Sequence, residues 1–313
     1  MPKPFHPKNL NLADVSEAED VPCCVCGAPP PGKAEFVVQT QRVVRCPICG
    51  LQRVSPRPAP AVLRQVYGAD YWKSPDSVLA GYTDYPGDEA NIRRTFRRRI
   101  KRVAPGHGGG LWLDVGCAYG FLLLEAEQAG YEVQGLEWSE AAAAAAPEAI
   151  RGRIRVGSFQ QADFPENAWD VISFWDYLEH SPDPKADLLK AYRLLKPGGR
   201  LSIVIPDAGS RLARWMGPRW EEFKKPQEHL YFFTGKQLAS LCASLGLTPQ
   251  GREWAGKYAR LDFALSRFKR GDGILFPVAR AGRFMLKMMG LEACVIYVNP
   301  RDKLHLLCQK ERA

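Results

Sequence analysis

The chain has 313 residues, of which 46% are hydrophobic, 25% charged and 11% aromatic. This length suits one large domain with a small accessory module, and the composition is that of a folded globular protein. The formal net charge of +9 favours an anionic partner, and the absence of any run of about 18 apolar residues excludes a membrane-spanning helix.

Residues 1–22 are polar and rich in proline, which predicts a flexible tail without the apolar core of a secretory signal. We therefore expect a cytoplasmic protein. In that compartment paired cysteines are more often metal ligands than disulfides.

Residues 23–56 contain two Cys-x-x-Cys pairs, Cys23 with Cys26 and Cys46 with Cys49, separated by 19 residues. This spacing is typical of a four-thiolate zinc ribbon, in which the metal replaces the core that so short a segment cannot build. The sequence predicts a structural Zn²⁺ ion at these four thiolates, in a closed site without a catalytic role.

Residues 57–110 follow as a helical linker or lid that contains scattered tyrosines, among them Tyr82 and Tyr85. Basic residues are clustered near its end: Arg93, Arg94, Arg97, Arg98, Arg99, Lys101 and Arg102. Such a cluster is either the solvated face of a helix or a contact surface for an anionic partner.

From residue 111 onward, strand and helix patterns alternate. The expected strands are 111–115, 131–137, 153–156, 169–175, 200–205 and 303–309, and the expected helices are 121–129, 139–146, 185–195 and 236–245. Alternation of this kind predicts an α/β domain over 111–313 with a parallel sheet and helices on both faces. Insertions near 208–232 and 257–298 are expected to cover its substrate site.

A glycine-containing turn follows the first expected strand and reads D-x-G-x-x-x-G, from Asp114 to Gly120. Glycines at 116 and 120 let the backbone approach a ligand closely. Glu137 ends the next strand, where a carboxylate can accept hydrogen bonds from ribose hydroxyls. The dinucleotide fingerprint G-x-G-x-x-G is absent, so another nucleoside cofactor is expected.

Four segments together resemble the motifs of class I S-adenosylmethionine methyltransferases: LWLDVGCAYGFLL, VQGLEWSE, AWDVISFWDYLEHSPDP and AYRLLKPGGRLSIVIPD. The resemblance implies a Rossmann-like, doubly wound, mostly parallel seven-stranded sheet and S-adenosylmethionine as cofactor. It implies that Asp114, Gly116 and Gly120 line the methionine side and that Glu137 binds the ribose. Ser158 and Phe159 stand where the family usually has an acidic residue near the adenine. The full predicted cofactor-binding set is Asp114, Gly116, Cys117, Gly120, Glu137, Trp138, Ser158, Phe159 and Trp175.

Candidate catalytic residues lie in the segment that follows the fifth strand and at the end of the fourth. His229 titrates near neutrality and Glu228 stands beside it, so either could take a proton from the methyl acceptor. His180 lies where ligands bind in such sheets. Each histidine is alternatively a structural residue whose ring is hydrogen-bonded by the backbone.

The cysteine pairs ahead of this domain, together with the later segment EHLYFFT, resemble bacterial methyltransferases of glycan and sugar-nucleotide pathways. In sugar C-methyltransferases a similar stretch lies at the active site and a preceding tyrosine assists, a position that Tyr82 or Tyr85 could fill. This chain lacks their further C-terminal domain, which favours a different acceptor, such as a hydroxyl on a glycan or small metabolite.

The remaining predictions concern partners. The basic, amphipathic stretch 267–290 is either a lid on its own domain or a contact with the acidic inner face of the membrane, near a lipid-linked acceptor. An RNA methyltransferase is an alternative function, although no Asn-Pro-Pro-Tyr type of motif follows the fourth strand. A non-catalytic zinc-ribbon scaffold is another. The sequence leaves the acceptor atom and the oligomeric state open.

Overall fold

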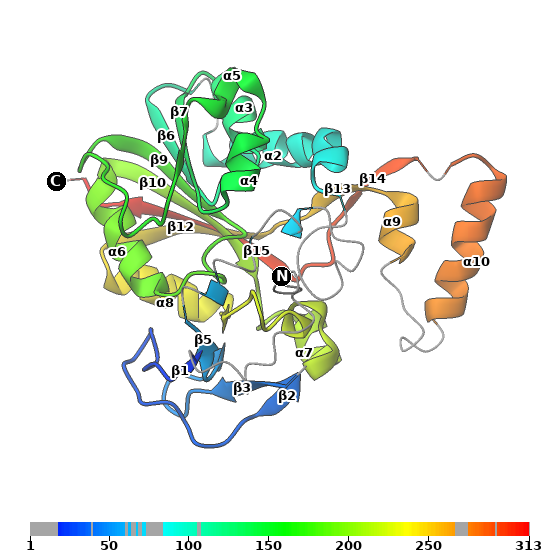
Figure 1. The fold of residues 1–313 in the computed structure, drawn as a ribbon, viewed down its shortest axis with the longest axis horizontal. Helices are drawn as coiled ribbons and strands as arrows, with labels where there is room; N and C mark the ends of the chain where they lie inside the picture. Colours follow the sequence, from blue (N-terminus) through cyan, green and yellow to red (C-terminus); the bar gives the residue numbers. More distant parts are fainter. Residues whose placement is uncertain are drawn as a thin grey trace, which may run out of the picture.

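A seven-stranded sheet forms the centre of the molecule (Figure 1). The computed structural model describes residues 18–38, 40–59, 62–63, 67, 71–72, 84–104, 108–266, 275–291 and 293–312. The strand order is β12-β15-β10-β9-β6-β7-β8. The strands are β6 (Leu111–Val115), β7 (Glu132–Glu137), β8 (Ile154–Val156), β9 (Trp169–Trp175), β10 (Leu195–Pro206), β12 (Leu247–Trp254) and β15 (Lys303–Lys310). Only β15 runs antiparallel to its two neighbours, so the predicted mostly parallel, Rossmann-like sheet is confirmed.

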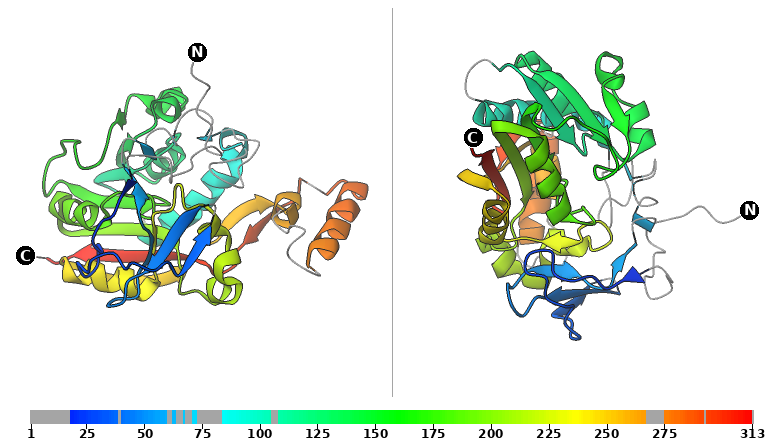
Figure 2. Two further views of the ribbon diagram at one scale, coloured as in Figure 1. Left: turned by 60° about the horizontal axis from the view of Figure 1, so that its bottom comes forward. Right: turned by 90° about the vertical axis from the view of Figure 1, so that its left-hand side faces the viewer.

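Helices cover both faces of this sheet (Figure 2). The helices are α2 (Glu89–Val103), α3 (Phe121–Gln128), α4 (Glu140–Ala144), α5 (Glu148–Arg151), α6 (Pro184–Leu194) and α8 (Gly235–Ser244). One core holds Trp112 and Val171 of the sheet with side chains of α2 and α3. The other holds Leu113 and Ile172 with side chains of α6 and α8. Neighbouring strand residues therefore enter opposite cores, as the two-residue period of a strand requires.

The N-terminal cysteine segment builds a second, smaller sheet. Its strands are β2 (Phe36–Val38), β3 (Gln41–Arg45), β4 (Gln52–Val54) and β11 (Tyr231–Phe232), in the order β11-β4-β3-β2. A separate pair joins β1 (Ala18–Glu19) to β5 (Arg57–Pro58). The insertion predicted near 208–232 includes β11 at its end, and this strand completes the N-terminal sheet by pairing with β4. No local pattern in the sequence reveals such a non-local pairing.

An arm extends from the body between β12 and β15 (Figure 1). It consists of the paired strands β13 (Lys257–Arg260) and β14 (Val295–Val298) with the helices α9 (Leu261–Ser266) and α10 (Leu275–Met288). The segment between β10 and β11 forms α7 (Arg211–Met216) and the 3-10 turns η4 (Gly217–Arg219) and η5 (Glu221–Lys224), while η3 (Pro86–Asp88) precedes α2. None of the described helices is long and apolar enough to cross a membrane.

The basic cluster lies on α2 and much of it packs within the molecule. Arg93 and Arg97 both donate to the buried carboxylate of Glu125 on α3. The guanidinium groups of Arg94 and Arg98 lie 4.0 Å and 4.4 Å from the ring centroids of Tyr258 and Tyr297 on the arm. Contacts of this kind contribute about 0.5–2 kcal/mol each, so this part of the cluster joins α2 to α3 and to the arm.

Candidate active site

A single large cavity opens at the carboxyl ends of β6, β7 and β9, where open α/β sheets bind their ligands. Its volume is about 1550 Å³. Ligand pockets usually enclose about 300–1,000 Å³, so this cavity has room for a cofactor and an acceptor side by side.

The turn from Asp114 to Gly120 forms one wall of the cavity. Gly116 has φ +76°, and a Cβ there would lie 2.9 Å from Tyr177 Cδ2. Gly120 has φ +70°, and its Cβ would overlap the side chain of Ile150. The two glycines are therefore required by left-handed backbone and by crowding from the protein itself, in addition to the close ligand approach that the sequence predicts.

Glu137, at the end of β7, is fixed by the turn and by its own strand end. Its carboxylate accepts hydrogen bonds from the backbone N–H groups of Ala118 and Ser139, both at 2.8 Å. The residue is 6% exposed, and burial raises its pKa. Each carboxylate oxygen can accept a further hydrogen bond, and Glu137 lines the cavity, so the arrangement fits a pair of ribose hydroxyls.

Asp114 is the penultimate residue of β6 and lines the same cavity. Its Oδ1 accepts a 2.5 Å hydrogen bond from Ser173 on β9. Burial raises the pKa of Asp114 to about 7. Cys117 lines the cavity too, but it packs in the core beside α3, so its role at the cofactor stays a prediction.

The remaining predicted cofactor residues also line the cavity. Trp138 stacks on Tyr67, with ring centroids 6.3 Å apart. Ser158 and Phe159 line the cavity in the segment that follows β8. Trp175 donates from its indole to Ser202 at 2.8 Å and lines the cavity from the end of β9. Their contacts with a cofactor stay predictions.

Three predicted catalytic residues meet at the other end of the cavity. The rings of His180 and His229 pack edge to face with centroids 4.6 Å apart. His180 Nδ1 lies 2.9 Å from the carbonyl oxygen of Glu228. A carbonyl oxygen only accepts, so Nδ1 carries the proton and Nε2 presents a lone pair.

The tyrosine that contacts this group is not one that the sequence singled out. The hydroxyl of Tyr71 donates to Glu228 Oε2 at 2.5 Å, and that of Tyr67 lies 2.9 Å from His180 Nδ1. Tyr85 instead packs against Tyr119 and Phe121 beside the cofactor turn, while Tyr82 falls outside the described residues. The close spacing of aromatic residues at 67, 71 and 72 is the feature of the sequence that could have pointed to Tyr71.

Burial controls the electrostatics of this end. Desolvation lowers the pKa of His229 well below its ordinary value, with help from His180 and nearby lysines, and it also lowers the pKa of His180. Both imidazoles are therefore neutral near pH 7. Desolvation raises the pKa of Glu179 well above its usual range. Lys303, by contrast, stays charged in an ion pair with Asp176.

The position of His229 depends on the N-terminal sheet. The backbone N–H of Leu230 donates to the carbonyl of Glu179 at 2.8 Å, and the carbonyl of Leu230 accepts from Val54 on β4 at 2.9 Å. The strand β11 follows at once. Residues 228–230 are thus held between the end of β9 and the cysteine module.

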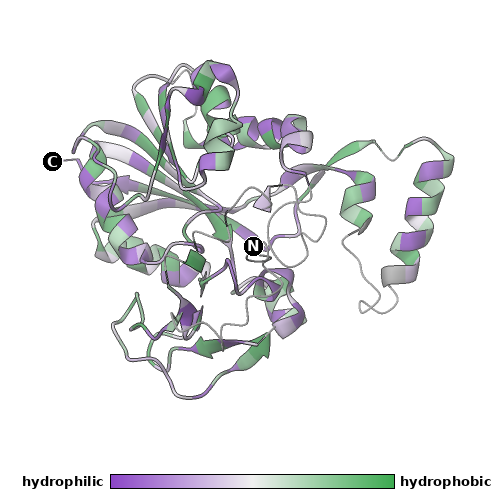
Figure 3. Cartoon of the chain, viewed as in Figure 1, coloured by the Kyte–Doolittle hydropathy of each residue, from purple (hydrophilic) through white to green (hydrophobic). Residues whose placement is uncertain are grey.

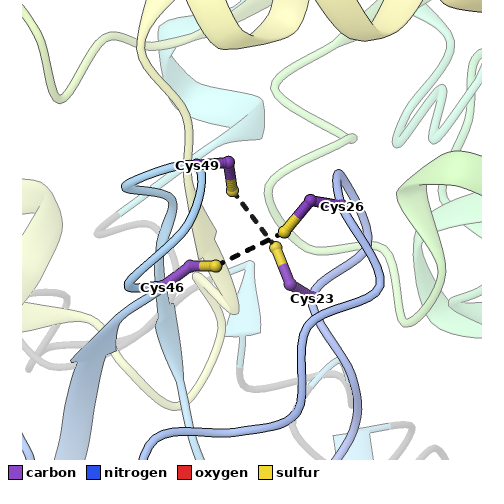
Figure 4. Close-up of side chains that lie close together, drawn as sticks. All are labelled: Cys23, Cys26, Cys46 and Cys49. Carbon is purple, nitrogen blue, oxygen red and sulfur yellow. Dashed lines mark hydrogen bonds between the residues drawn. The ribbon is translucent and has the colours of Figure 1, made fainter.

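The four predicted metal ligands converge in that module (Figure 4). The sulfur atoms of Cys23 and Cys49 are 3.4 Å apart, those of Cys26 and Cys46 are 3.5 Å apart, and all four lie within 4.8 Å of one another. Tetrahedral Zn²⁺ with Zn–S bonds of about 2.3 Å places its sulfurs about 3.8 Å apart, so the group fits this ion. Gln237 of α8 donates to the Cys49 carbonyl at 2.8 Å and joins the module to the large domain.

The fold and the site together define a class of protein. A mostly parallel seven-stranded sheet, a glycine turn after its first central strand and a buried acid at the end of the next are the features of a class I S-adenosylmethionine-dependent methyltransferase domain. A family model described as a methyltransferase domain matches residues 89–250, more than half of the chain. The chain therefore belongs to the methyltransferase-domain family.

Curated relatives include two O-methyltransferases. A ubiquinone biosynthesis O-methyltransferase of Sodalis glossinidius is 31% identical over 136 residues, 40% of this chain and 54% of the relative. A nocamycin O-methyltransferase of Saccharothrix syringae is 34% identical over 150 residues, 45% of this chain and 53% of the relative. The chain thus spans only about half the length of these two relatives.

Solved structures show the same fold at low identity. A candidate methyltransferase of Bacillus halodurans C-125 has a TM-score of 0.50 and 15% identity, covering 69% of this chain and 98% of its own. A second match is a chain from the complex between the Haloferax volcanii Trm112 methyltransferase activator and a candidate methyltransferase. Its TM-score is 0.51 and its identity 16%, and the match covers 72% of this chain and 95% of the other.

Proposed function

We propose that the protein transfers a methyl group from S-adenosylmethionine to a hydroxyl group of a small-molecule acceptor, with a sugar hydroxyl among the acceptors of suitable chemistry. One observation carries the proposal: a single cavity has the glycine turn and Glu137 at one end and two neutral imidazoles at the other. The relatives named as O-methyltransferases support a hydroxyl acceptor.

The cofactor supplies an electrophilic methyl group on a sulfonium, which departs as a thioether. The chain then has to align the acceptor and remove its proton as the new O–CH₃ bond forms. We assign proton removal to His229, whose neutral ring is 4% exposed at the cavity wall. His180 packs against that ring and donates to the Glu228 carbonyl, while Tyr71 donates to the Glu228 carboxylate.

Zinc belongs to the proposal as a structural ion. Cys23, Cys26, Cys46 and Cys49 would hold it, and it would stabilise the sheet on which residues 228–230 rest. Metal analysis of the purified chain should give one zinc per molecule, and Cys46→Ser combined with Cys49→Ser should abolish it. Metal-free wild-type protein of undiminished stability would contradict this assignment.

A labelling experiment separates the proposed function from two alternatives, an RNA methyltransferase and a non-catalytic scaffold. Purified protein is incubated with methyl-labelled cofactor and with catechols, quinol precursors, sugar nucleotides or bulk RNA. We expect label on a hydroxyl-bearing small molecule. Label on RNA alone would overturn the acceptor class. The intramolecular contacts of Arg93 and Arg97 with Glu125, and of Arg94 and Arg98 with arm tyrosines, speak against RNA as the partner of this basic cluster. Failure of the purified protein to bind the cofactor at all would favour the other alternative, a non-catalytic zinc-ribbon scaffold.

The variant Tyr71→Phe tests the arrangement at the acceptor end. Loss of a hydrogen bond to a carboxylate should lower the transfer rate about tenfold, since such bonds contribute about 1.5–3 kcal/mol. The dissociation constant of the cofactor should not change. Tyr297→Phe, on the arm and 5.2 Å from Tyr258 by ring centroids, is the control. Equal losses in both variants would show that the Tyr71 effect is only structural.

A further inference from the structure

The helix α10 exposes a stripe of large apolar side chains. Four of them, together with Met289 directly after the helix, are between 61% and 73% exposed: Val278, Phe284, Met285, Met288 and Met289. Their separations of three, four and seven residues place them on one side of a helix. Exposed apolar groups gathered in this way mark an interaction surface rather than the scattered exposure normal for soluble proteins.

The other sides of α10 have different roles. Ala279 is buried, and a Cβ on Gly282 would contact Leu265 at 3.4 Å, so small residues pack α10 against α9. Arg280, Arg283 and Lys287 provide three positive charges. Residues 275–291 contain no aspartate or glutamate. Figure 3 shows hydrophobic and hydrophilic residues alternating along this helix.

The same arm forms one wall of the active-site cavity. Leu261, Phe263 and Leu265 of α9 line it, as do Ile296 and Val298 of β14. These five side chains are apolar, although Lys257 and Arg260 of β13 also line the cavity, and the opposite end holds the histidines and carboxylates. The helix α10, which bears the stripe, therefore belongs to the same arm as α9 and β14 (Figure 1), whose side chains line the cavity.

We propose that α10 docks on the surface of an anionic phospholipid bilayer. Its apolar stripe enters the boundary between headgroups and acyl chains, and Arg280, Arg283 and Lys287 approach the lipid phosphates. Docking brings the apolar wall of the cavity to the membrane, so that an acceptor with an apolar tail enters from the bilayer. The statement about the acceptor rests on the proposed methyl transfer, while the docking itself does not.

Charge distinguishes this partner from a second copy of the chain. Residues 275–291 contain three cations and no acidic residue, so two copies of this helix would meet with like net charge and no opposite charge to offset it. Repulsion of that kind is unfavourable at low ionic strength. An anionic lipid surface carries the charge opposite to that of the helix.

Flotation of the full-length protein with vesicles tests the docking. Vesicles of phosphatidylcholine alone are compared with equal parts of phosphatidylcholine and phosphatidylglycerol, at low and high ionic strength. We expect binding to the anionic vesicles that weakens with salt. Phe284→Ser combined with Met288→Ser should lower the partition coefficient about tenfold. Replacing the three cations by glutamine should lower it about fivefold for each charge.

Leu189→Ser is the matched control, because Leu189 is an exposed helical side chain on α6. It should float like the wild type. No flotation with anionic vesicles, equal flotation with neutral vesicles, or a dimer that the Phe284/Met288 variant dissociates would each overturn the proposal. Cofactor binding, measured in the same samples by calorimetry, reports on the proposed function separately.

A second readout addresses the acceptor. Labelled cofactor is incubated with a total lipid extract reconstituted in anionic vesicles, and the organic phase is counted. The wild type should label a lipid-phase product, and the Phe284/Met288 variant should label it several-fold less while binding cofactor normally. Label confined to water-soluble acceptors would overturn the inference about the acceptor.

Discussion

Removal of the metal ligands of the cysteine module should impair the acceptor end of the site and spare the cofactor end. In Cys46→Ser combined with Cys49→Ser the module would lose two ligands of the proposed zinc ion, which contributes about 10–16 kcal/mol in isolated zinc modules. The strand β11 then loses its partner β4, including the hydrogen bond from Val54 to Leu230.

Loss of this pairing should lower the transfer rate because of where His229 lies in the chain. His229 directly precedes Leu230, and a displacement of about 1 Å in a catalytic group can lower a rate about a hundredfold. We therefore expect a transfer rate lower by one to two orders of magnitude. Glu137 and the glycine turn belong to β6 and β7, which contact neither β4 nor β11 in the sheet order, so the cofactor dissociation constant should change little.

Three measurements check this expectation. Single-turnover transfer and calorimetric cofactor binding are compared between the variant and the wild type, and hydrogen exchange is followed at the amides of Leu230 and Tyr231. Cys294→Ser, an exposed cysteine outside the module, is the control. Full transfer activity in a metal-free variant, or slow exchange at both amides, would refute the idea that the module positions His229.

Other perturbations have equally definite outcomes. Gly116→Ala should weaken cofactor binding and cost about 1–3 kcal/mol of stability, because the backbone φ is +76° and a Cβ would lie too close to Tyr177. The control is Gly152→Ala, where a Cβ would meet open space, and it should change neither property. Thermal unfolding compares the stability of the two variants. Burial lowers the pKa of His229 and of His180 below the ordinary 6.5, so the acid limb of the rate profile should lie below pH 6.5. Below pH 6.5 these two histidines bind protons in the unfolded chain more readily than in the folded protein, so the free energy of unfolding should fall as pH drops through 6.5. Burial raises the pKa of Asp114 from 3.8 to about 7, so between these pH values the folded state binds one more proton than the unfolded chain. The free energy of unfolding should therefore decline as pH rises from about 4 to about 7. Asp114→Asn should remove this pH dependence of the unfolding free energy, as measured in denaturant titrations.

The sequence predicted the large sheet well because its signals are local. The strands 111–115 and 169–175 agree with β6 and β9, since short apolar runs bounded by turns specify buried strands. Ser139 does cap α4, accepting from the N–H of Ala142. The glycine turn and Glu137 came from the same local patterns.

The parts that the sequence did not predict are non-local. Pairing of β11 with β4 joins residues about 180 positions apart, and strand propensity carries no information about such a partner. Tyr71 reaches Glu228 across a similar separation, whereas the resemblance to sugar C-methyltransferases pointed to Tyr82 or Tyr85. The packing of Arg94 and Arg98 over arm tyrosines likewise depends on where the chain returns.

The central claim is that this cavity binds S-adenosylmethionine through Glu137 for methyl transfer. Calorimetric titration of the wild type and of Glu137→Ala with S-adenosylmethionine tests it most directly. Glu137→Ala removes the acceptor for the ribose hydroxyls, and hydrogen bonds to a carboxylate contribute about 1.5–3 kcal/mol each. We predict saturable one-to-one binding by the wild type and a dissociation constant at least about a hundredfold higher in the variant. No binding by the folded wild type, or equal affinity in both proteins, would contradict the account.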